Sequence, residues 1–234
     1  MSTAIAVAKS TSRAGVFERA SGGSVFLDEL GEFPPAAIEA LRQPLEEGRV
    51  TISRAAHSTT FPADFVLVAA MNPCPCGLDG AGTAAACTCT PMQRRRYLAR
   101  ISGPLADRVD LQVSLLRPTL ADLEFGASSA EPTSVVAARV AAARERMASR
   151  LAGTPWRVNS DVPGPVMRRQ FGLSVDAGSP LDAAVARGSV SARGADRVVR
   201  VAWTLADLAG RDRPSRADVG GALIYRDAGL SWAA

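Results

Sequence analysis

The chain has 234 residues, of which 47% are hydrophobic, and this is enough apolar material for one large domain or two modest ones. Its net charge of +4 suits an acidic partner such as nucleic acid only weakly, because acidic residues are interspersed with the basic ones. No apolar run approaches the ~20 residues of a membrane span, and the first residues lack the apolar segment of a secretory signal. We therefore expect a cytoplasmic protein with no membrane partner.

The first segment with a chemical signature is an apolar run that ends in two acids. Residues 24–27 are typical of a parallel strand buried on both faces, and Asp28 and Glu29 follow directly. Ligands of open α/β sheets bind at the carboxyl ends of strands, where these carboxylates would emerge. In a Walker B segment, Asp28 would hold Mg²⁺ and Glu29 would orient or deprotonate the attacking water. Taken alone, such a strand more often just leads into a solvated loop.

The next segments continue the α/β pattern. A helix is predicted from Pro34 to near Gly48, followed by a β-hairpin within residues 47–65. Residues 65–70 predict a second buried strand, which ends just before Asn72. A polar side chain at this place could contact the γ-phosphate of a nucleotide or the attacking water, although a turn former before proline is the alternative.

Four cysteines then form two C-x-C pairs on a glycine-rich loop. They are Cys74, Cys76, Cys87 and Cys89. Two thiolate pairs of this kind can close a tetrahedral Cys₄ zinc site. The alternative is four free thiols, since a reducing cytoplasm disfavours disulfides. A zinc ion with four cysteine ligands has no open position, so its role would be structural.

An arginine flanked by acids follows the cysteine loop. A basic helix is predicted from Thr90, and alternating apolar residues predict a strand over 111–115. Arg108 lies between them, with Asp107 and Asp110 close by. Its planar cation could enter the site of a neighbouring subunit as an arginine finger. An intramolecular salt bridge is the alternative.

The pattern becomes helical after residue 118. Residues 118–132, rich in Pro, Gly and Ser, predict a linker between an α/β part (residues 1–117) and a helical domain (residues 133–234). The predicted helices begin at Ser134, near Pro163, at Ser191 and at Ser215. Arg193 lies at the start of the longest of them, where it is either a ligand-sensing cation or an ordinary solvated residue.

In this order, the motifs resemble those of the magnesium-chelatase-like AAA+ ATPases, and within them the ComM (YifB) branch. The resemblance covers about residues 15–230 and is most specific in VFLDELGEF, FPADFVLVAAMNPCPCG, RRRYLARISGPLADRVDL and SARGADRVVRVAWTLADL. It implies a parallel-sheet AAA+ core followed by an all-helical lid. By position it implies these roles: Asp28 and Glu29 as the Walker B acids, Asn72 as sensor 1, Arg108 as the arginine finger and Arg193 as the sensor 2 arginine.

The resemblance also implies cofactors and partners. Members of the family are ring-forming machines driven by ATP with Mg²⁺, so a homo-oligomeric ring, such as a hexamer, is implied. The ComM branch is associated with DNA branch migration during natural transformation, which makes DNA the implied partner. The chelatase branch is associated with metal insertion into porphyrin.

One family motif has no counterpart in the printed sequence. The phosphate-binding loop follows GxxxxGK[ST], in which backbone N–H groups cradle phosphate and the lysine meets the β/γ-phosphates. Here the sole lysine, Lys9, follows Ala8 and is too close to Asp28 for the intervening helix and strand of an AAA+ core. We therefore expect a chain that lacks the N-terminal part of the core, including the phosphate-binding loop, and that is inactive as an ATPase alone.

Two alternatives remain open from the sequence. The stretch GVFERASGGSVFLDELGE also suits a sigma-54-type activator, which would carry a GAFTGA loop earlier and a helix-turn-helix at its end. The cysteine-rich loop and the lack of an evident terminal DNA-reading motif favour the ComM branch. The other alternative is a non-catalytic, zinc-stapled DNA-binding protein or adaptor remnant.

Overall fold

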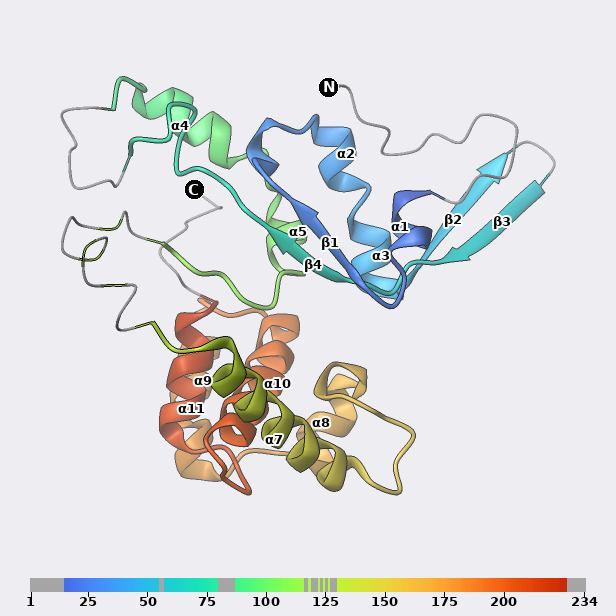
Figure 1. Ribbon diagram of the computed structural model, residues 1–234, viewed down its shortest axis with the longest axis vertical. Coiled ribbons are helices and arrows are strands. Elements are labelled where there is room, and N and C mark those ends of the chain that lie inside the picture. Colours follow the sequence, from blue (N-terminus) through green and yellow to red (C-terminus); the bar gives the residue numbers. More distant parts are fainter. Residues whose placement is uncertain are drawn as a thin grey trace. The chain divides into compact units, whose positions relative to one another are not determined.

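A computed structural model of the chain describes residues 15–54, 57–79, 87–115 and 130–226, together with residues 118, 122, 124 and 126. The chain forms two compact units, of which the first ends at Val109 and the second begins at Asp110 (Figure 1). The predicted linker, residues 118–132, lies largely outside the described residues. No helix in the described part has both the length and the hydropathy of a membrane span.

The first unit is a mixed α/β fold. Its elements are α1 (Val16–Arg19), β1 (Ser24–Leu27), the 3-10 turn η1 (Leu30–Glu32), α2 (Pro35–Glu39), α3 (Arg42–Glu47), β2 (Arg49–Arg54), β3 (His57–Pro62), β4 (Val66–Ala69), α4 (Pro91–Leu98) and α5 (Gly103–Ala106). β1 pairs with β4 in parallel, from Ser24 opposite Val66 to Leu27 opposite Ala69. β2 and β3 form the predicted antiparallel hairpin.

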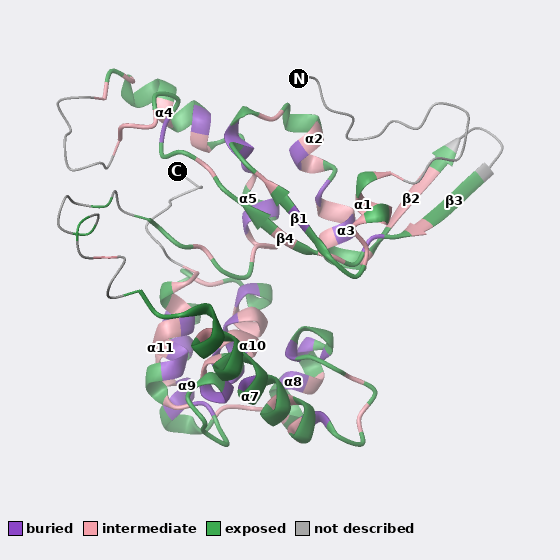
Figure 2. Cartoon of the chain, in the orientation of Figure 1, coloured by how far each residue is buried: buried purple, intermediate pink, exposed green. Residues whose placement is uncertain are grey.

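The parallel pair has one covered face and one open face. Val25 is 6% exposed, and Leu27 and Leu67 pack against a core that includes Ile38, Leu41 and Leu105. On the other face, Phe26 is 64% and Val66 is 65% exposed (Figure 2). The prediction of strands is confirmed, whereas the prediction that both faces are buried is wrong. Among the described residues, helices cover only one side of this sheet.

The helix predicted from Pro34 to Gly48 is interrupted. It forms two short helices, α2 and α3, because Pro44 has no N–H to donate to the carbonyl of Ala40. A new helix that begins at Arg42 places Pro44 in its first turn, where no such bond is needed. Gly48 then ends α3 with a φ of 64°, a left-handed conformation that glycine adopts without strain.

The strand predicted over residues 111–115 is wrong. These residues form no strand, and Leu111, Val113 and Leu115 are exposed. The backbone N–H of Gln112 donates instead to the carbonyl of Tyr225 over 2.8 Å. Alternating apolar residues fit a strand only where another strand offers its edge, and the described strands are paired elsewhere.

The second unit is helical, as predicted. Its elements are α7 (Thr133–Leu151), the 3-10 turn η3 (Asn159–Asp161), α8 (Gly164–Gln170), α9 (Val175–Ala186), α10 (Ala192–Leu208) and α11 (Arg216–Ile224). Ser191 and Ser215 cap α10 and α11 through their hydroxyls. α9 was not predicted, because Gly178 and Pro180 disfavour a helix.

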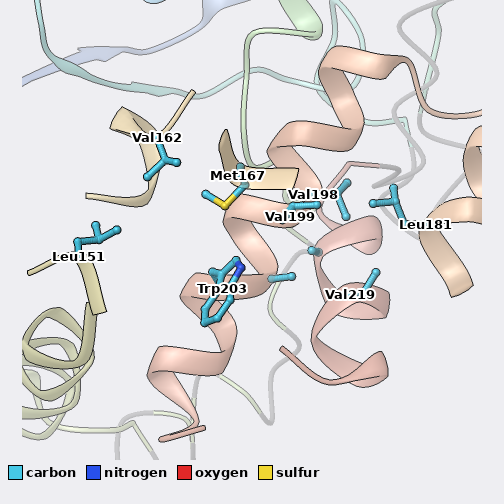
Figure 3. Close-up of a cluster of buried hydrophobic side chains, with 10 residues drawn as sticks. Leu151, Val162, Met167, Leu181, Val198, Val199, Trp203 and Val219 are labelled. Atoms are coloured by element: carbon cyan, nitrogen blue, oxygen red, sulfur yellow. The ribbon is translucent and has the colours of Figure 1, made fainter. Parts of the chain in front are cut away.

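α10 lies at the centre of the second unit's core. Its Val198 and Trp203 pack among side chains from α7, α8, α9, α11 and the segment after η3: Leu151, Met167, Leu181, Val219 and Val162 (Figure 3). The indole N–H of Trp203 donates to the carbonyl of Phe171 over 2.8 Å, so the ring is buried with its polar atom satisfied. The apolar face of α10 therefore supplies the surface against which the other helices of the unit pack.

A buried ion pair joins α7 to α10. The guanidinium of Arg150 donates to both carboxylate oxygens of Asp207 and to Oδ1 of Asn159, and it lies 4.3 Å from the ring centroid of Trp203. The Asp207 side chain is 3% exposed. Removing one partner of such a pair leaves an uncompensated buried charge.

We predict that Asp207→Ala destabilises the second unit by about 3–5 kcal/mol, because it leaves the Arg150 cation without its negatively charged partner. Chemical denaturation followed by Trp203 fluorescence measures this loss. The matched control is Glu131→Ala, which breaks the solvent-exposed ion pair with Arg139 and should have a far smaller effect. If the two variants lower the free energy of unfolding equally, the buried pair stabilises the unit no more than the exposed pair does.

Candidate active site

The structure brings three of the predicted site residues to one edge of the parallel pair. Asp28 and Glu29 directly follow β1, and Asn72 follows β4. The backbone pairing continues past the strands, since the N–H of Leu30 donates to the carbonyl of Ala70 over 2.9 Å. All three side chains are exposed. The carboxyl edge of the sheet therefore presents two carboxylates and an amide to solvent.

Glu29 has an unusual backbone conformation. Its φ of 52° and ψ of 44° are left-handed, and no other non-glycine residue in the described part has a positive φ. This conformation costs about 1–2 kcal/mol for a residue with a Cβ. The Glu29 N–H donates to Oδ1 of Asp28 over 2.9 Å, which fixes one carboxylate against the turn. Such strain gathers at functional sites, where the position of a side chain matters more than stability.

The turn that follows Asp28 and Glu29 packs against α4. A Cβ on Gly31 would collide with the ring of Tyr97, which is 3% exposed, so only glycine permits this close approach. Arg100, just past α4, donates to the carbonyl of Gly31 and lies 3.6 Å from the Glu32 carboxylate. Sequence reasoning missed this support. The available signal was the glycine that follows the acidic pair.

These residues fit part of a magnesium–nucleotide site. The Asp28 carboxylate supplies the hard oxygen ligand that Mg²⁺ prefers, and Glu29 and Asn72 could hold a water molecule. The groups that cradle phosphates are a separate requirement. The printed sequence has no GxxxxGK[ST] motif, and Lys9 lies outside the described residues.

The two predicted arginines belong to different units, Arg108 to the first and Arg193 to the second. Arg108 donates to the carbonyl of Pro104 over 2.5 Å and forms an ion pair with Glu46, and its side chain is 10% exposed. To act as a finger it would have to leave Glu46. Arg193 is exposed in the first turn of α10, in the second unit. The finger and sensor 2 roles stay predictions.

The four predicted cysteines are brought together. Their Sγ atoms all lie within 4.8 Å of one another, and all four are free thiols. Cys74 is fully buried and Cys76 is exposed. A hydrogen bond from the Leu78 backbone lowers the pKa of Cys76 to about 6, while desolvation raises the pKa of Cys89 to about 12. The cluster thus favours one thiolate and opposes further negative charge in the absence of a cation.

This arrangement fits the AAA+ fold: a parallel-stranded α/β unit with acids and an amide at its carboxyl edge, followed by a helical unit. Residues 2–123 match the family model of the magnesium chelatase subunit ChlI, and residues 130–226 match the model of the ChlI C-terminal region. The chain belongs to the magnesium chelatase ChlI family. The expected family is confirmed. The phenol regulator MopR of Acinetobacter guillouiae is 49% identical over 61 residues, which cover only 26% of this chain, so the family models favour the ChlI family over the sigma-54-type alternative.

Longer relatives match nearly the whole chain. An uncharacterized protein of Mycobacterium tuberculosis is 46% identical over 217 residues, which cover 93% of this chain and 42% of the relative. YifB of Escherichia coli is 36% identical over 213 residues, covering 91% of this chain and 40% of YifB. The competence protein ComM of Haemophilus influenzae is 36% identical over 212 residues, with the same coverage. The chain spans about two fifths of the length of these relatives.

Proposed function

We propose that this chain belongs to an ATP-driven ring that remodels branched DNA, and that it supplies the residues of the ring that hydrolyse ATP. The observation that carries the proposal is the convergence of Asp28, Glu29 and Asn72 at the carboxyl ends of adjacent parallel strands, with Glu29 held in a strained turn. The similarity to YifB and ComM over 91% of the chain supports this choice within the family.

Each residue at the edge has a separate task in this proposal. Asp28 would hold Mg²⁺, and a bound ion would supply positive charge next to the phosphates of the nucleotide. Glu29 accepts a proton from the attacking water or orients it, and the Asn72 amide holds that water in line. The clamp of Tyr97 on Gly31 keeps the acidic turn in place while charge develops.

The test uses a completed enzyme, defined here as this chain joined behind a GxxxxGK[ST]-bearing segment from a family member. We expect Mg²⁺-dependent ATP turnover that rises with branched DNA, and ATP-dependent conversion of a labelled four-way junction into duplex products. Linear duplex of the same length is the control. Turnover without any response to branched DNA would retain the ATPase assignment and overturn the DNA role.

A second candidate function is a non-catalytic adaptor stapled by metal. The cysteine cluster favours it, because a metal-held loop stabilises a small fold without any need for nucleotide. If the completed enzyme binds ATP and shows no turnover, the adaptor function replaces the hydrolytic one.

A further inference from the structure

The cysteine cluster has the dimensions of a site for one tetrahedral metal ion. The Sγ atoms of Cys74 and Cys76 are 3.3 Å apart, those of Cys76 and Cys87 3.6 Å, and those of Cys74 and Cys87 3.8 Å. With metal–sulfur bonds of about 2.3 Å, sulfur atoms at the corners of a tetrahedron lie ~3.8 Å apart. The observed separations need only small adjustments to reach this geometry.

The chemistry of the ligands selects the kind of metal. Four sulfur ligands are soft donors that favour zinc over magnesium or calcium. All four ligand positions are filled by the protein, so the ion would have no open position for catalysis. The exposed Cys76 gives an ion access from solvent, while the buried Cys74 shields the other side.

A zinc ion with four thiolate ligands is negatively charged, and Arg94 is a nearby cation. One Zn²⁺ with four thiolates carries a net charge of about −2. Arg94 of α4 donates to Oδ1 of Asp79 over 2.5 Å, and both residues are about one-third exposed. Coulombic attraction to Cys87 and Cys74 adds to the effect of Asp79 in raising the pKa of Arg94. Arg94 would therefore offset the part of the negative charge of a tetrathiolate site that its pairing with Asp79 leaves open to it.

The cysteines lie in two segments of the chain, so a shared metal ion would join these segments. Cys74 and Cys76 follow β4 and Asn72, whereas Cys87 and Cys89 directly precede the capped start of α4 at Thr90. A shared ion would fasten the start of α4 to the end of β4. α4 in turn carries Tyr97, which packs on Gly31 in the turn after the acids.

We propose that Cys74, Cys76, Cys87 and Cys89 bind one zinc ion, and that this ion is a clip that holds α4 against the turn following Asp28 and Glu29. The metal does not touch nucleotide. It positions the acidic turn through α4, Tyr97 and Gly31. The zinc site is structural, and it does not depend on ATP hydrolysis by this chain.

Metal content is the first measurement. The 234-residue chain, purified under reducing conditions without chelator, should contain about one equivalent of zinc. Cys87→Ser combined with Cys89→Ser should reduce this to background, whereas Thr88→Ala, a change between the two ligands, should retain it. With Co²⁺ as the sole added metal, the unaltered chain should show the absorption of tetrahedral thiolate coordination. Absence of metal and of this absorption in reduced, soluble protein would overturn the site.

Hydrogen exchange tests the clip separately from the site. Removing the ion with a thiol-specific reagent should speed amide exchange in α4 and at residues 30–33, and leave α10 unchanged as an internal control. Returning the thiols to their free form and adding Zn²⁺ should restore the slow exchange. Metal that binds and leaves without any change at α4 or the acidic turn would overturn the positioning role.

Discussion

Arg108→Ala should lower the ATP turnover of the completed enzyme by about 10³–10⁵-fold, the effect of losing an arginine finger. A finger stabilises the charge that develops on the phosphate in a neighbouring subunit's site. In the structure Arg108 is instead paired with Glu46. The matched control is therefore Glu46→Gln, which weakens this pairing and leaves the guanidinium in place. We expect it to retain turnover.

Mixed rings show whether Arg108 acts across subunits. Arg108→Ala subunits retain their own Glu29, and Glu29→Gln subunits retain their own Arg108. An equal mixture should recover up to about a quarter of the unaltered turnover, because that share of interfaces in a randomly mixed ring pairs the two intact groups. A mixture as inactive as either variant alone would contradict action in trans and favour a structural salt bridge.

Glu29→Gln should lower turnover of the completed enzyme by about 10²–10⁴-fold while ATP binding is retained. The amide has nearly the shape of the carboxylate, but it cannot take a proton from the attacking water. Binding of a fluorescent ATP analogue and single-turnover hydrolysis measure the two steps separately. Glu32→Gln is the control, since Glu32 lies in the same turn but pairs with Arg100. If the two variants lose turnover equally, Glu29 does not act as the base for the attacking water.

Local signals in the sequence predicted much of the fold. Thr90, Ser191 and Ser215 mark helix starts because their hydroxyls satisfy backbone N–H groups that the helix leaves unpaired. The apolar runs at residues 24–27 and 65–70 predicted two strands, one ending just before the acids and the other just before Asn72. The structure has both strands and pairs them in parallel.

The remaining features depend on contacts between distant segments. Phe26 and Val66 are apolar residues in strands, and their exposure depends on whether another layer covers that face. The same dependence on a partner explains why residues 111–115 form no strand. The approach of Tyr97 to Gly31 joins segments far apart in sequence, and neither residue type alone predicts it. α9 forms despite Pro180 because its Leu181 packs in the core of the second unit.

The central claim is that Asp28, Glu29 and Asn72 act on ATP only when a phosphate-binding loop is supplied. Contacts from backbone amides and a lysine to phosphate are charge-assisted and contribute roughly 1.5–3 kcal/mol each, so we expect nucleotide binding without them to be weaker by many orders of magnitude. The most direct test is Mg²⁺-dependent ATP turnover by the purified 234-residue chain, measured beside the completed enzyme and its Glu29→Gln variant. We predict no turnover by the chain alone, and turnover by the completed enzyme that Glu29→Gln lowers by about 10²–10⁴-fold. Turnover by the isolated chain that disappears with Glu29→Gln would contradict the claim and show that its phosphates are held in another way.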